Sequence, residues 1–303
     1  MPNINLLDFN EKAANKLDER FVHDSVSAIL AANPSDFNFV DARTVLLDEE
    51  NMSGLADYSR DNGFVQGTIA QVKRPYTLSM DRGRSFTIDS VDAEDATIKG
   101  ADKMRRFQKE HVAPEVDAFT IAKLFSYAKA NGHVDGAKIT ADNVFAKFLE
   151  LQNALQDTVG YGEDIICFVS AGASALLQQS DKFARNVNVA DFKRGEVFTK
   201  VKAIDTTPLL PVSNRLMKSE YQFLNGIDAA QKNGGFLPTD DAEQIGFILM
   251  SRKAAAQITK CKKIRTFTPE TNQRADAWQF DYRRFYDVLA SKEKSRGIFA
   301  VTM

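Results

Sequence analysis

The residue types that most often carry chemistry are few in this sequence and poorly spaced for it. The three histidines, His23, His111 and His133, stand far apart, and none has a partner at the spacing of a metal site. Cys167 lies inside an apolar run, which is typical of an inert buried thiol, and Cys261 lies among lysines, where we expect an exposed structural thiol. We therefore predict no catalytic residue, no metal site and no bound cofactor.

Two charged clusters remain, and neither indicates an enzyme. Residues 81–84 read Asp-Arg-Gly-Arg, which could trap an anion, but a charged hairpin turn is the favoured interpretation. Arg283 and Arg284 are adjacent, so on a strand they face opposite ways and do not build one basic surface. The sequence also has no glycine-rich dinucleotide motif, no P-loop and no nucleophile elbow.

The composition is that of an ordinary globular protein. The chain has 303 residues, 44% hydrophobic and 26% charged, with a formal net charge of −2. This length predicts about two domains, and the charge gives no bulk attraction to nucleic acid. We find no signal peptide and no apolar run of about twenty residues, so we expect synthesis in the cytosol, no membrane partner and reduced cysteines.

A half-apolar β-hairpin is the most distinctive predicted element. Apolar and hydroxyl residues alternate with period two over 77–80 and 85–88, with the turn placed at 81–84. One face of this hairpin would be apolar and needs a partner to cover it. The residues of that face are Leu78, Met80, Phe86 and Ile88.

Helical spacing indicates two helices, or one kinked helix, over 92–131, with a break at Pro114 and an end at Asn131-Gly132. A second helix starts after Thr140 and ends near Gly160. Residues 165–169 read as a buried strand. Further strands are expected toward the C-terminus, and the whole is an α+β chain.

Short sequence patterns predict several smaller elements elsewhere in the chain. Ser170 is expected to cap a small helix, a second short helix is expected over 253–257, and 219–241 reads as a long loop. Near the N-terminus, an apolar stripe that includes Ile29 and Leu30 predicts either a surface helix or an arm that docks on another subunit.

A large fold with apolar-faced projections and no chemical site favours a building block of an assembly. Phenylalanine is abundant, at 22 residues against a single tryptophan, which is typical of packing and interfaces. Such a chain functions through its surface.

Four segments, taken in order, resemble the major capsid protein of tailed bacteriophages. The resemblance extends from about Gly54 to the C-terminus, and it rests on 54–60 (GLADYSR), 81–89 (DRGRSFTID), 114–119 (PEVDAF), and 269–273 (PETNQ) with 281–283 (DYR). It implies the Hong Kong 97-type capsid fold, which encapsulin shells share.

The resemblance also implies a division of the chain. An N-terminal arm would occupy 1–41, and a peripheral domain 42–139 would contain an extended loop at about 64–91 and a spine helix at about 92–131. An axial domain would span 140–249. Residues 250–303 would return to the peripheral domain.

The implied function is a non-enzymatic shell protein that assembles into hexamers and pentamers of an icosahedral head. Implied partners are a separate scaffolding protein, a portal, and packaged double-stranded DNA held without sequence-specific contact. The implied location is the virion, reached from the host cytoplasm. An encapsulin-like compartment and a cytosolic enzyme of unknown class are the alternatives.

The predicted hairpin is the expected interface with a neighbouring subunit. On this interpretation Phe86→Asp blocks assembly but leaves a folded subunit. We see no motif that assigns a covalent crosslink. The expected interface residues are Leu78, Met80, Asp81, Arg82, Arg84, Phe86 and Ile88.

Overall fold

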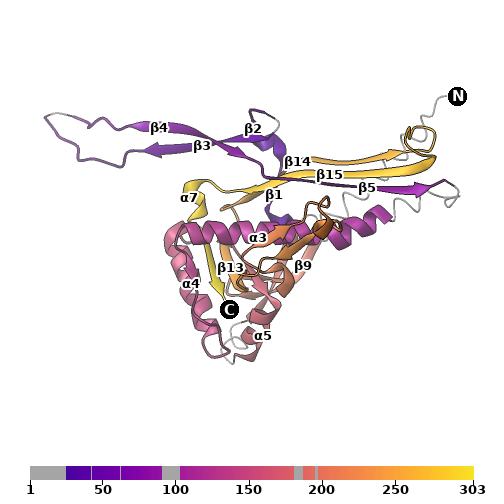
Figure 1. Cartoon of the computed structure of the whole chain (residues 1–303). Coiled ribbons are helices and arrows are strands. Elements are labelled where there is room, and N and C mark those ends of the chain that lie inside the picture. Colours follow the sequence, from indigo (N-terminus) through magenta and orange to yellow (C-terminus); the bar gives the residue numbers. More distant parts are fainter. Residues whose placement is uncertain (1–24, 42, 62, 91–102, 181–186, 195–196) are drawn as a thin grey trace.

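The computed structural model describes residues 25–41, 43–61, 63–90, 103–180, 187–194 and 197–303. It shows a wedge-shaped body beneath a long, narrow layer of strands, which extends past the body at both ends (Figure 1). Two larger sheets organise these parts: one lies inside the body and the other forms much of the upper layer.

A seven-stranded sheet forms the centre of the body, in the order β6-β16-β13-β7-β10-β9-β8. Its middle strands are β7, β13 and β10, and every residue of β7 and β13 is buried. Helices α4 (Val144–Val159) and α5 (Ala171–Gln179) cover one face. The strands are β6 (Val134–Asp135), β7 (Ile165–Ser170), β8 (Val187–Arg194), β9 (Val197–Ile204), β10 (Thr207–Val212), β13 (Ile245–Ser251) and β16 (Ile298–Thr302).

Strand β7 shows why this part of the chain is apolar without alternation. Cys167 and Val169 pack in the cluster under α4 and α5, whereas Ile166 and Phe168 pack in the cluster against helix α3 (Ala113–Ala130). A strand with both faces covered needs apolar residues at every position. The buried strand predicted at 165–169 is therefore confirmed.

The predicted helix ends are also found. Ser170 Oγ accepts a hydrogen bond from the Ala173 N–H at 3.2 Å and caps α5. Helix α4 ends at Gly160, whose φ of 90° suits the residue that closes a helix. The short helix predicted at 253–257 is wrong, because strand β14 (Ala256–Phe267) begins there.

The second sheet has four strands in the order β1-β14-β15-β5, and it forms the long layer above the body. Strand β15 (Ala277–Leu289) pairs antiparallel with β14 on one side and with β5 (Met80–Asp89) on the other. Strand β1 (Ala31–Ala32) pairs with β14. Strand β5 forms one edge of this sheet.

The hairpin predicted with its turn at 81–84 is wrong. Residues 80–89 form one continuous strand, β5, in which Gly83 pairs with Arg283. A Cβ at Gly83 would lie 2.8 Å from the Tyr282 carbonyl oxygen, so glycine here permits close approach of β15 and does not make a turn. The alternation at 77–80 therefore spans the junction between β4, which ends at Thr77, and β5, which begins at Met80, and the alternation at 85–88 lies within β5.

The hairpin that does project is formed by β3 (Thr44–Met52) and β4 (Ile69–Thr77). These strands pair antiparallel over their full length, from Thr44 opposite Thr77 to Met52 opposite Ile69. Strand β2 (Asn38–Phe39) joins its base. Figure 1 shows the β3–β4 hairpin extending well clear of the body.

The spine helix continues through the predicted break at Pro114. Residues 103–107 are helical, 108–112 form a π-helical turn, and α3 follows directly. A proline lacks the N–H and its ring crowds the preceding turn, and the wider π turn just before Pro114 relieves that crowding. The helix ends at Ala130 with Gly132 at a φ of 74°, as expected from Asn131-Gly132. Its predicted start at 92–102 lies outside the described residues.

The first described residues are fastened to the spine helix by a buried carboxylate. Asp117 Oδ1 accepts from Ser25 Oγ at 2.5 Å, Ser27 Oγ at 2.6 Å and the Ser27 N–H at 2.9 Å. Its Oδ2 accepts from the Val26 N–H at 3.1 Å. Ile29 and Leu30 are buried in the core of the same chain. Residues 25–32 therefore pack against their own subunit. The part of the apolar stripe that precedes residue 25 lies outside the described residues.

We expect Asp117→Ala to lower the free energy of unfolding by about 1–3 kcal/mol, because buried donors of Ser25, Val26 and Ser27 would lose their acceptor. Urea unfolding measures this change. Asp142→Ala removes an exposed carboxylate and is the matched control. Equal stability of the two variants would contradict the anchoring role of Asp117.

Two further expectations need correction. Residues 250–303 do not return to one domain, because β14 and β15 lie in the four-stranded sheet whereas β16 pairs with β13 in the seven-stranded sheet. The apolar run of β16 fits that buried position. The long loop at 219–241 contains a small two-stranded sheet of β11 (Tyr221–Phe223) and β12 (Phe236–Pro238).

Candidate functional site: the assembly surfaces

Cys167 and His133 are of residue types often used for catalysis, and each packs against its own chain. Cys167 is fully buried, and desolvation raises the pKa of its thiol far above the usual value. The His133 ring stacks on Phe299 with centroids 4.1 Å apart. Among the described residues, no group of three or more His, Cys, Asp or Glu side chains could hold a metal ion. His23 lies outside the described residues.

Two of the predicted interface residues are covered by their own chain. Leu78 is 3% exposed and packs with Val45 and Phe285, and Met80 is 9% exposed and lies in the main core. The prediction that a neighbouring subunit covers these two side chains is wrong. They follow the base of the hairpin, where residues of the same subunit cover them.

Phe86 and Ile88 face the spine helix of the same subunit. The Phe86 ring meets Phe107 edge-to-face with centroids 4.8 Å apart, and Ile88 packs in the same small cluster with Met104. Phe86 nevertheless keeps 36% of its surface exposed. A contact of Phe86 with a neighbouring subunit therefore stays a prediction.

The charged residues of β5 are partnered in different ways. Arg283 bonds to both carboxylate oxygens of Asp81, at 2.9 and 2.6 Å, and these bonds lower the pKa of Asp81. Arg82 forms a bidentate ion pair with Glu115 on α3, in which Nε lies 2.7 Å from Oε1 and Nη2 lies 3.2 Å from Oε2. Arg82 also donates to the carbonyls of Leu224 and Gly235, so it joins the sheet, the spine helix and the 224–235 loop.

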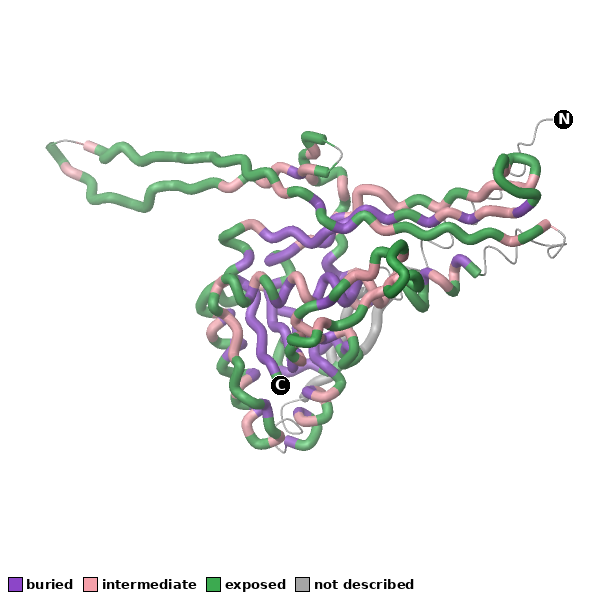
Figure 2. Tube along the Cα trace, in the orientation of Figure 1, coloured by how far each residue is buried: buried purple, intermediate pink, exposed green. Residues whose placement is uncertain are grey.

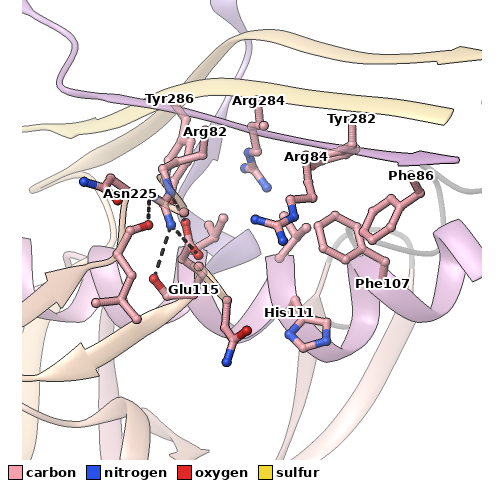
Figure 3. A pocket seen from close by; sticks show the side chains of 18 residues that line it. Arg82, Arg84, Phe86, Phe107, His111, Glu115, Asn225, Tyr282, Arg284 and Tyr286 are labelled. Atoms are coloured by element: carbon pink, nitrogen blue, oxygen red, sulfur yellow. Dashed lines mark hydrogen bonds and ion pairs between the residues drawn. The ribbon is translucent and has the colours of Figure 1, made fainter. Parts of the chain in front are cut away.

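These elements enclose a cavity of about 350 Å³, which we call the arginine pocket. Figure 3 shows Arg84 and Arg284 pointing into it from the sheet, with Phe86, Phe107 and His111 along one side. Three arginines and one carboxylate line it, so the pocket carries an excess of positive charge. The lining includes Arg82, Arg84, Arg284, Glu115, Phe86, Phe107, His111, Tyr282, Tyr286 and glycines of the 224–235 loop.

The two inward arginines differ in their surroundings. Arg284 is buried, donates to Thr259 Oγ1 at 3.0 Å and lies over the Tyr286 ring at 4.9 Å. Arg84 is exposed and makes no ion pair with any residue that the structure describes. A Cβ added at Gly226 would lie 3.0 Å from its Nη1 and would crowd it, whereas one added at Gly234 would lie 3.6 Å away, in ordinary contact. Arg84 is thus a pocket-lining cation without an ion-pair partner among the described residues.

The sequence interpretation missed an exposed apolar surface on the β3–β4 hairpin. Phe64 is 89% exposed and Ile69 is 75% exposed, far beyond the body of the molecule. Figure 2 shows this hairpin as almost continuously exposed. The Asn62-Gly63 pair between strand-like runs was the available turn signal. The exposed apolar residues are Met52, Leu55, Tyr58, Phe64, Val65, Ile69 and Val72.

Solved phage capsid structures have a similar fold. The mature capsid of bacteriophage PhiM1 matches with a TM-score of 0.58 at 13% identity, covering 86% of this chain and 82% of that chain. The capsid of cyanophage P-SCSP1u matches with a TM-score of 0.57 at 10% identity, covering 88% and 84%. A virus-like particle from Pyrococcus furiosus matches with a TM-score of 0.50 at 9% identity, covering 96% and 98%.

No family model and no curated protein sequence matches the chain. The similarity is therefore one of architecture, and the chain has the Hong Kong 97-type capsid fold. This confirms the fold predicted from the four sequence segments. No helix among the described residues is both long and apolar enough to cross a membrane.

Proposed function

We propose that this chain is the major capsid protein of a tailed bacteriophage and assembles into the icosahedral shell around the phage genome. The observation that carries the proposal is a long hairpin, in a chain with a capsid fold, whose apolar side chains stay exposed in the part of the subunit that the structure describes. Monomeric proteins rarely expose such a surface, and a neighbouring copy would bury it. The role is structural and needs no catalytic group.

We also propose a revised division of the chain. The axial domain comprises the seven-stranded sheet with α4 and α5, including β16, and the peripheral domain comprises the four-stranded sheet with α3. The extended loop is the β3–β4 hairpin with its tip at 53–68, in place of residues 64–91. The arm is limited to the residues that precede the Asp117 anchor.

The partners follow from this role. Copies of the chain would form hexamers and pentamers, with a scaffolding protein and a portal taking part in assembly in the host cytoplasm. Packaged double-stranded DNA would meet the inner wall without sequence-specific contacts. The near-neutral net charge supports this, since a strongly basic wall would grip phosphate.

Expression of the chain, alone and with its scaffolding protein, tests the proposal. We expect closed shells of uniform diameter by negative-stain electron microscopy and a fast-sedimenting peak, because many modest contacts combine into high avidity. A monomer or small oligomer under all assembly conditions would contradict a capsid role.

A protein compartment of the encapsulin type is a second candidate, since the Pyrococcus furiosus particle matches over nearly its whole length. The contents of shells purified from the native source separate the two functions. Nucleic acid with a portal and tail supports the capsid, whereas an enclosed enzyme supports the compartment.

A further inference from the structure

The arginine pocket has features of a ligand site that a shell role does not require. It lies between strands β5 and β15, the spine helix and the 224–235 loop, all of one chain (Figure 3). Its volume of about 350 Å³ lies within the range of about 300–1,000 Å³ that is typical of small-molecule pockets. The pocket is therefore of a size for a small molecule, and a single subunit supplies its walls.

The charge of the pocket favours an anion. Among the described residues that line it, Glu115 is the one carboxylate, and Arg82 already forms a bidentate ion pair with it. Arg84 and Arg284 both point into the pocket from the sheet (Figure 3), and Arg84 makes no ion pair with any described residue. Two converging guanidinium groups suit an anion with two negative charges, and a phosphate monoester carries about −1.5 to −2 at pH 7.

A buried hydroxyl group in the pocket points to a polar ligand independently of the charge. Tyr286 is 1% exposed, and its hydroxyl has no hydrogen-bond partner among the described residues. It lines the pocket beside Arg284, whose guanidinium carbon lies 4.9 Å from the centre of the Tyr286 ring. Buried hydroxyl groups nearly always have a partner, because leaving one unsatisfied costs free energy. A phosphate oxygen bound by Arg284 would accept a hydrogen bond from this hydroxyl.

The other side of the pocket is aromatic. Figure 3 shows Phe86, Phe107 and His111 along this side, across from the arginines. Phe86 keeps 36% of its surface exposed, and Phe107 is half-buried, so these rings are accessible to a ligand. Aromatic side chains of this kind stack on nucleic-acid bases without needing a particular base. A ligand that carries both a phosphate and a planar ring would therefore contact both sides of the pocket.

The third wall is held in place by the subunit itself. Arg82 donates to the carbonyls of Leu224 and Gly235, which fixes the 224–235 loop over the pocket. A Cβ at Gly226 would lie 3.0 Å from Arg84 Nη1, so glycine at this position leaves room for the guanidinium group. The pocket is thus formed before any ligand binds, which reduces the entropy lost on binding.

We propose that the arginine pocket binds a nucleoside monophosphate. The phosphate pairs with Arg84 and Arg284 and accepts a hydrogen bond from the Tyr286 hydroxyl. The base stacks against Phe86 and Phe107. This inference goes beyond the proposed shell function and does not depend on it, because all of these residues belong to one subunit.

Isothermal titration calorimetry of the full-length chain with AMP and with dTMP tests the proposal. We expect saturable binding of at least one of them, with one site per chain. Inorganic phosphate and the matching nucleoside each make half of the contacts, so each should bind at least about tenfold more weakly. The same titration on the chain with serine at Phe64, Val65 and Ile69 includes a form designed to stay unassembled.

Binding by either form supports the inference. Absence of saturable binding of both nucleotides by both forms would overturn it. Inorganic phosphate that binds as tightly as the nucleotide would also overturn it, because the aromatic side would then contribute nothing.

Substitution of Arg84 locates the bound nucleotide. Arg84→Met should raise the dissociation constant at least about tenfold, because the phosphate would lose one of its two guanidinium partners. Arg252→Met removes an exposed arginine in the turn after β13 and is the matched control, which should bind like the unsubstituted chain. Circular dichroism checks that both variants are folded. An equal effect of the two substitutions, or no effect of Arg84→Met, would overturn the site and leave the capsid role intact.

Discussion

Replacing Phe64, Val65 and Ile69 with serine should abolish closed shells and leave a folded subunit in solution. These side chains are 89%, 65% and 75% exposed in the isolated chain, so their loss removes little from its own packing. Each would contribute about 1.5–3 kcal/mol when a neighbour buries it. Sedimentation and electron microscopy measure the shells, and circular dichroism measures the fold.

The matched control keeps the hairpin apolar. Phe64→Leu, Val65→Ile and Ile69→Val alter shape but preserve a buried surface, so this triple variant should still assemble. If the serine variant also formed shells in normal yield, the hairpin would not be the assembly surface. If it lost its fold, the apolar residues of the hairpin would serve the subunit itself.

Elements governed by their own local sequence were predictable. The apolar run at 165–169 becomes β7, Ser170 caps α5, and Gly160 ends α4, because periodicity and capping depend on neighbours a few residues away. The long helix over the second half of the spine followed from the same spacing. Pro114 did not break it, since a π turn accommodates the ring.

The partners of each strand were not predictable in this way. The alternation before and after Gly83 indicates strand on both sides, and a glycine between two strand-like runs is typical of a turn. The competing role of Gly83, close approach to the Tyr282 carbonyl of β15, depends on a residue about 200 positions away. The same limitation applies to β16, because its pairing with β13 also joins residues that are distant in sequence.

Only part of the candidate assembly surface could be predicted from the sequence. The segment 54–60 was informative through its resemblance to capsid proteins, yet periodicity gave no sign that it projects from the body. Whether an apolar residue is exposed depends on the whole fold. Leu78 and Phe64 are both apolar residues in the sequence, but Leu78 is buried and Phe64 is exposed. The arginine pocket likewise combines β5, α3 and the 224–235 loop.

Arg82→Met should destabilise the subunit, whereas Arg84→Met should not, although the two arginines stand two residues apart on one strand. Arg82 bonds to Glu115 and to the carbonyls of Leu224 and Gly235, and the Glu115 side chain is only 13% exposed. Its loss leaves a largely desolvated carboxylate without a counter-charge, at a cost of about 2–4 kcal/mol. Urea unfolding followed by the single tryptophan, Trp278 on β15, measures the change.

The Arg84 variant is the matched control for stability. Arg84 makes no ion pair within the described part of the subunit, so Arg84→Met should unfold within about 0.5 kcal/mol of the unsubstituted chain. The comparison separates Arg82, which holds Glu115 and the 224–235 loop, from Arg84, which makes no ion pair among the described residues. Equal stability losses in both variants would contradict this division.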